Sequence, residues 1–262
     1  MTEFATTTMG DTVAYDRHGD GGPGVVFIAG AGPNRAGDPM TTATARMLAD
    51  RGVTAVVHDR LGRNESPAEG VLTLERELAA VAAMIDAAGG SAVLVGHSSG
   101  CAIAIEAARA GAPVDGLVLW EAPFMKTADD AREWIDEFER RLDAGDRDGA
   151  QRQYMRDMPA EFIENAQAAG VWDAIVAAVE SLRPDGRALV AVAAEPLQRV
   201  LEAVSVPVLA IVGEDTFPGM AQAADAIAAA APDGASERIA GAHHMWDPDA
   251  MVDRLALFLG LD

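Results

Sequence analysis

A serine stands where an expected strand meets an expected helix. The apolar run over residues 92–95 leads into Gly-His-Ser-Ser-Gly, whose first serine is Ser98, and an alanine-rich helical pattern follows at once. Ser98 at such a turn would sit in strained backbone with its hydroxyl exposed, and Gly96 and Gly100 would let strand and helix approach closely. The helix start would also place free backbone N–H groups beside a developing oxyanion. We therefore expect Ser98 to be a nucleophile rather than part of an ordinary Gly/Ser turn.

A serine hydroxyl is a weak nucleophile and needs an adjacent base. The chain has five histidines. Three of them are expected to be structural or to point away from Ser98, namely His18, His58 and His97. The base is then expected to be His243 or His244, which lie in a loop after the last expected strand.

The elements that must position these residues alternate between strand and helix. Alternating residues on either side of Gly10-Asp11 predict a hairpin with strands at 3–9 and 12–17. Further strands are predicted at 25–29, 53–57, 92–95, 114–120, 208–212 and 237–240. Helical periodicity predicts helices at 39–51, 73–88, 101–110, 219–231 and 248–259. This alternation predicts an α/β fold with a mostly parallel sheet and helices on both faces.

One long stretch breaks the alternation. Between residues 125 and 204 no strand pattern occurs, and helices are expected at 128–144, 147–157, 160–169, 172–182 and 188–203. We therefore expect a core domain made of residues 1–124 and 205–262, and a helical insertion of residues 125–204.

Composition narrows the classes of partner and compartment. The 262 residues carry a formal net charge of −21, which disfavours nucleic acid and anionic membranes as partners. Cys101 is the single cysteine, so no intrachain disulfide is possible, and we expect it to be a buried core residue. The first residues lack a signal-peptide pattern and no stretch is apolar enough to span a membrane, so a cytoplasmic location is expected.

Five motifs in order resemble the α/β-hydrolase family over almost the whole chain. They are Ala29-Gly30-Ala31, Asp59-Arg60-x-Gly62-Arg63-x-x-Ser66, the Gly-x-Ser-x-Gly segment at Ser98, the acidic loop after Val212, and Gly241-Ala242-His243-His244. The resemblance implies an eight-stranded, mostly parallel sheet, with the helical insertion as a cap over the site.

The resemblance also implies roles for particular residues. Counting from Gly241, the family pattern selects His244 as the base. The acid is either Asp215, one residue before the usual position, which is Thr216 here, or Glu121 at the end of the sixth strand. Glu121 is slightly preferred, because the haloalkane dehalogenase subgroup carries its acid there. The backbone N–H groups of Ser99 and Ala31 would form the oxyanion hole, with Ala29 in place of the usual histidine.

The expected reaction needs no cofactor and no metal. The glycine-rich loop at 29–33 lacks the full dinucleotide pattern, and no His/Cys/Asp cluster has metal-ligand spacing. Phe124, Met125 and Trp246 are candidate pocket residues. A serine at position 98 excludes the family's epoxide hydrolases and haloalkane dehalogenases, which use aspartate there.

The expected function is hydrolysis of a small, mostly apolar carboxylic ester through an acyl-enzyme, by a monomer or a homodimer. Two alternatives stay open. The same triad could open lactones, cleave C–C bonds, or support perhydrolysis or lyase chemistry. In a different class, the chain could be a non-enzymatic small-molecule receptor.

Overall fold

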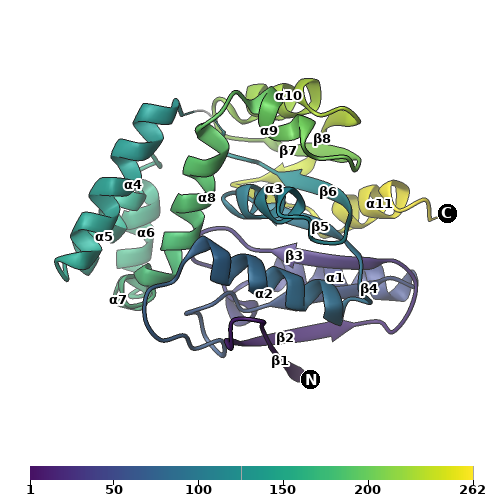
Figure 1. Cartoon of the computed structure of the whole chain (residues 1–262), viewed down its shortest axis with the longest axis horizontal. Helices are drawn as coiled ribbons and strands as arrows, with labels where there is room; N and C mark the ends of the chain where they lie inside the picture. Colours follow the sequence, from purple (N-terminus) through teal and green to yellow (C-terminus); the bar gives the residue numbers. More distant parts are fainter. Residues whose placement is uncertain (125, 262) are drawn as a thin grey trace.

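A single twisted sheet forms the centre of the molecule. The computed structural model describes residues 1–124 and 126–261, and Figure 1 shows its elements. The strand order is β1-β2-β4-β3-β5-β6-β7-β8-β9. The strands are β1 (Thr2–Thr6), β2 (Thr12–His18), β3 (Gly24–Ile28), β4 (Thr54–His58), β5 (Ala92–His97), β6 (Val114–Trp120), β7 (Val208–Asp215), β8 (Gly234–Ala242) and β9 (Met245–Trp246).

The sheet is parallel through its middle. The pairs from β4 through β3, β5, β6 and β7 to β8 are all parallel, whereas β1, β2 and β9 pair antiparallel. The eight expected strands are therefore present. The ninth strand, β9, forms because the chain after His244 turns back and pairs with Gly241 and Ala242.

Helices cover both faces of the sheet because its central strands are apolar on both sides. Alternate residues of β3 enter two separate clusters: Val26 packs with one layer of helices, and Val25 with the other. The first layer contains α2 (Leu74–Ala87), α3 (Gly100–Arg109), α8 (Arg183–Ala193), α9 (Leu197–Glu202) and α10 (Met220–Ala230). The second layer contains α1 (Pro39–Asp50), preceded by η1 (Arg35–Gly37), and α11 (Pro248–Phe258).

The remaining helices form a group beside the carboxyl ends of the strands (Figure 1). They are α4 (Ala128–Asp143), α5 (Arg147–Tyr154), α6 (Glu161–Ala168), α7 (Trp172–Ala177) and η2 (Val179–Leu182). Trp134, Phe138 and Tyr154 are central to a hydrophobic cluster that belongs to this group. We call these elements, together with α8, the cap; its boundary at residues 125–204 stays a prediction.

The expected helix over residues 188–203 is wrong in its bounds. Helix α8 already begins at Arg183, with Pro184 in its first turn, where the missing proline N–H costs no hydrogen bond. Pro196 then separates α8 from α9. Ala188 and Val192 pack into the core cluster with α3, so α8 joins the cap to the core.

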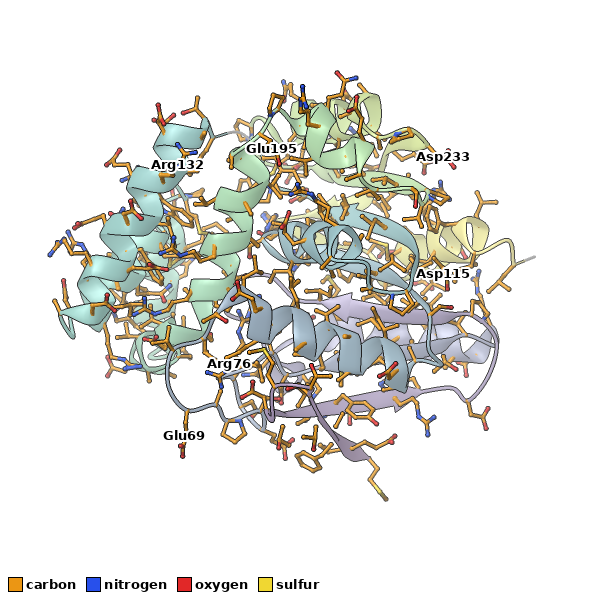
Figure 2. The ribbon with its side chains drawn as sticks, viewed as in Figure 1. Glu69, Arg76, Asp115, Arg132, Glu195 and Asp233 are labelled. Atoms are coloured by element: carbon orange, nitrogen blue, oxygen red, sulfur yellow. The ribbon has the colours of Figure 1, made fainter. Side chains whose placement is uncertain are left out.

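Charged side chains cover the outside of this assembly. Glu69, Arg132 and Asp233 are exposed, and Figure 2 shows them on the periphery of the molecule. Among the helices of the described residues, none has the length and apolar character needed to cross a membrane.

Candidate active site

Ser98 occupies a strained turn between β5 and α3. Its φ is +54°, in the left-handed region that non-glycine residues rarely adopt. Its backbone N–H donates a 2.9 Å hydrogen bond to the Trp120 carbonyl at the end of β6. A Cβ on Gly96 would lie 2.6 Å from Cys101 Cα, and one on Gly100 would lie 2.3 Å from the Ile28 carbonyl oxygen. The tight turn therefore requires glycine at both flanking positions.

His244 and Glu121 form a direct pair. His244 Nδ1 lies 2.5 Å from Glu121 Oε2, and the Glu121 side chain is fully buried just beyond β6. The other carboxylate oxygen, Oε1, accepts a 3.1 Å hydrogen bond from the Gly213 N–H. Because an ionised carboxylate can only accept, we assign the proton to His244 Nδ1, which leaves Nε2 with a free lone pair.

The surroundings of Glu121 favour its ionised form. Burial raises the pKa of Glu121, but the hydrogen bonds from His244 and Gly213 and the nearby Thr216 hydroxyl outweigh burial and lower it below the usual value. The Thr216 hydroxyl is buried and completes no hydrogen bond with the described residues. Glu121 is therefore a carboxylate at neutral pH.

The competing candidates for acid and base lie at the surface. Asp215 is exposed at the end of β7, and His243 is exposed beside His244. In the part of the chain that the structure describes, neither side chain forms a hydrogen bond or an ion pair. The structure thus brings together Glu121 and His244, and leaves Asp215 and His243 outside this pair.

The loop that carries His244 is tied to the serine turn through neighbouring residues. The His244 carbonyl accepts from His97 Nε2 at 2.9 Å and from Trp120 Nε1 at 3.2 Å. Burial, and then the adjacent His244, lower the pKa of His97 to about 4, so its ring is neutral. No hydrogen bond joins Ser98 Oγ to His244 among the described residues; such contacts are often long before substrate binds.

Backbone donors for an oxyanion lie next to Ser98. A Cβ on Gly30 would lie only 2.9 Å from Ser98 Cβ, so the loop after β3 passes directly beside the serine. The N–H groups of Ala31 and Ser99 donate no hydrogen bond to any described residue. An oxyanion hole requires two free donors of this kind, so both N–H groups are candidates for that role.

Two arginines anchor the loop that carries Ala31. Arg60 Nη1 donates to the Ala29 carbonyl at 3.1 Å, and Arg63 Nη1 donates to the Gly30 carbonyl at 2.7 Å. Sequence analysis gave these arginines no role, although both lie in the Asp59-Arg60-x-Gly62-Arg63 motif after β4.

The expected pocket residues have different positions. Trp246 is 3% exposed, donates from its indole Nε1 to Thr44, and packs against Phe27 and Trp120, so it is a core residue. The pocket role expected for Trp246 stays a prediction. Phe124 is partly buried against the core. Met125 lies outside the described residues.

Sequence analysis missed one aromatic residue near His244. The Phe217 ring, in the loop after β7, lies 5.6 Å from the His244 ring. Phe162 of cap helix α6 lies 5.9 Å from Phe217. No local pattern marks Phe217, but it closely follows Asp215 in the loop that was expected to carry the acid.

Comparisons with known proteins agree with this architecture. An alpha/beta hydrolase from Sphaerobacter thermophilus DSM 20745 has a similar structure, with 28% identity, a TM-score of 0.81, and coverage of 98% of this chain and 99% of that one. A thermophilic esterase from Thermogutta terrifontis is 24% identical, with a TM-score of 0.70 and coverage of 99% and 98%. An enol-lactonase from Burkholderia xenovorans LB400 is 16% identical, with a TM-score of 0.65 and coverage of 98% and 97%.

Sequence comparison leads to the same family. No curated protein matches the sequence. The model of the alpha/beta hydrolase family, in contrast, matches residues 25–256. Because that match covers most of the chain, the protein belongs to the alpha/beta hydrolase family.

Proposed function

We propose that this protein is a serine hydrolase that cleaves a small, mostly apolar carboxylic ester without a cofactor. Ser98 is the nucleophile, His244 the base and Glu121 the acid. One observation carries the proposal: the 2.5 Å contact between His244 Nδ1 and the buried Glu121 carboxylate, in a loop tied to the strained turn at Ser98. In such a pair the carboxylate orients the imidazole and stabilises its protonated form, so that the imidazole can take the proton of a serine hydroxyl.

The first half of the reaction forms an acyl-enzyme. Ser98 Oγ attacks the ester carbonyl carbon while His244 Nε2 takes the hydroxyl proton. Glu121 holds the imidazole in the required tautomer and stabilises the imidazolium that forms. The N–H groups of Ser99 and Ala31 donate to the negative oxygen of the tetrahedral intermediate. His244 then gives its proton to the leaving alcohol.

The second half uses water in place of Ser98. His244 takes a proton from the water, which attacks the acyl carbon, and the second tetrahedral intermediate uses the same two donors. Collapse of that intermediate releases the carboxylic acid and returns the proton to Ser98. Each group ends in its starting state, so no external reagent besides water is consumed.

Apolar side chains favour an apolar substrate. The Phe217 ring lies against His244, and Phe162 of the cap packs against Phe217. The similar structures include an esterase, which agrees with an ester substrate, and an enol-lactonase, which makes lactone opening the second candidate for the same triad.

A substrate panel tests this proposal. We expect p-nitrophenyl acetate and butyrate to be hydrolysed faster than a matched lactone series, and Ser98→Ala to reduce kcat by about 10⁴-fold or more. Ester hydrolysis that persists unchanged in purified Ser98→Ala would contradict the proposal. Faster turnover of lactones than of esters would move the assignment to the second candidate.

A further inference from the structure

A buried carboxylate on the cap contacts the residue that follows the nucleophile. Asp185 lies in the first turn of α8 and is fully buried. Its Oδ1 accepts a 2.6 Å hydrogen bond from Ser99 Oγ. Ser99 is also the residue whose backbone N–H would donate to the oxyanion, so one side chain of the cap fixes the peptide that carries this donor.

The same carboxylate reaches the second donor through two arginines. Asp185 Oδ1 lies 2.6 Å from Arg60 Nη1, and Oδ2 lies 3.2 Å from Arg63 Nη2. Those guanidinium groups in turn bind the carbonyls of Ala29 and Gly30, directly before Ala31. Asp185 therefore stands at the meeting point of both segments that would form the oxyanion hole.

The charges of this cluster balance without solvent. Arg60 also binds Glu77 of α2 through Nε at 2.6 Å, which gives two buried guanidinium groups and two buried carboxylates. Burial alone lowers the pKa of Arg60, but Asp185 and Glu77 raise it above its usual value. Burial and the charge of Arg60 lower the pKa of Arg63 to about 10, which keeps it charged at neutral pH. Buried ion pairs such as these are costly to break, and their hydrogen bonds restrict the movement of the segments that they connect.

Helix α8 gives the cluster its connection to the cap. The helix packs on α3 and α2 in the core and on α4 in the cap, and Figure 1 shows it between these two groups. Arg63 Nε also donates to Ser181 Oγ just before α8, at 3.1 Å. A displacement of α8 would therefore move the partners of both donor segments at once.

We propose that Asp185 is a positioning residue that couples docking of the cap helix α8 to the alignment of the two oxyanion donors. The proposal rests on the proposed hydrolase function. Asp185 touches no reacting atom; it acts through Ser99 Oγ on one side and through Arg60 and Arg63 on the other. The account requires that the loss of these bonds weakens binding of the transition state more than binding of the substrate.

Two variants separate this role from a general loss of folding. Asp185→Asn keeps the shape but removes the charge, and Ser99→Ala removes one hydrogen bond while it keeps the backbone donor. Glu139→Gln is the matched control, because Glu139 binds Arg187 and so holds the same helix α8 to α4, away from the donor loop. Steady-state kinetics on p-nitrophenyl butyrate is combined with the Ki of a trifluoromethyl ketone, a transition-state analogue whose Ki does not depend on the fraction of folded enzyme.

We expect kcat to fall by about ten- to hundredfold in Ser99→Ala and at least as far in Asp185→Asn, with KM changed by less than about threefold. The Ki should rise by a similar factor in both, and Glu139→Gln should stay close to wild type. If Asp185→Asn does not fold, Ser99→Ala decides the question by itself.

Two results would overturn this role. One is a Ser99→Ala enzyme with unchanged kcat and Ki. The other is a Glu139→Gln enzyme that loses as much as Asp185→Asn, because general docking of α8 would then explain the effect. A wild-type chain that hydrolyses no ester would instead refute the proposed function, and the role of Asp185 with it.

Discussion

At the scale of single side chains, the first point to test is which acid, Glu121 or Asp215, orients His244. Glu121 is buried and hydrogen-bonded to His244, whereas Asp215 is exposed. We expect Glu121→Gln to lower kcat by about 10³- to 10⁴-fold, because an amide cannot hold the imidazole and balance its charge. Asp215→Asn should change kcat by less than about twofold. Kinetics of both purified variants on one ester gives the ranking, and the reverse ranking would assign the acid to Asp215.

Single residues also mark the limit of prediction from sequence. Ser98 and the histidine pair are predictable because a strand, a tight turn and a helix are local patterns. The choice between Glu121 and Asp215 is not local, since they lie at the ends of neighbouring strands, β6 and β7, and differ in burial and in the partners that the fold brings to them. Asp185 lies between the helices expected at 172–182 and 188–203, and nothing in that stretch indicates the arginines that it meets, more than a hundred residues earlier in the chain.

At the scale of elements, the proposed oxyanion hole requires close contact between the loop that carries Ala31 and the turn at Ser98. A Cβ on Gly30 would lie 2.8 Å from the His97 carbonyl oxygen and 2.9 Å from Ser98 Cβ. Gly30→Ala should therefore push the loop away from the turn and lower kcat by about tenfold or more, with the fold retained. Gly37→Ala is the control, because its Cβ would meet only the Asn34 side chain at 3.7 Å. Equal activity of the two variants would show that this close approach is not needed.

Elements differed in how well their bounds could be predicted. The expected strand at 114–120 matches β6, because a strand buried on both faces is a continuous apolar run. The helices of the insertion are less marked. The expected helix at 188–203 covers parts of α8 and α9. Helix α8 begins earlier than expected because Pro184 is tolerated in its first turn, and Pro196 interrupts the helix inside the expected range.

At the scale of the whole molecule, buried neutral histidines should make stability depend on pH. Burial, followed by the charge of Arg60, lowers the pKa of His58 to about 3, and neither ring nitrogen has a hydrogen-bond partner among the described residues. The unfolded chain binds a proton at His58 below about pH 6.5, whereas the folded chain does not. Stability must therefore fall as pH falls from about 6.5 toward 3.

This dependence can be measured by urea unfolding at pH 8 and pH 5. His58 should account for about 2 kcal/mol of the loss of unfolding free energy between these pH values. In His58→Gln the loss between pH 8 and pH 5 should be smaller by about that amount, whatever the absolute stability of the variant. An unchanged pH dependence in His58→Gln would contradict a buried, neutral His58.

The central claim is that Ser98 is a nucleophile activated by His244, and covalent labelling tests it most directly. The wild type, His244→Ala and His243→Ala are treated with a fluorophosphonate probe, and the adducts are located by intact mass and peptide mapping. The account predicts labelling of Ser98 in the wild type and in His243→Ala, and none in His244→Ala over the same time. A wild type that stays unlabelled at Ser98, or a His244→Ala variant labelled as fast as the wild type, would contradict it.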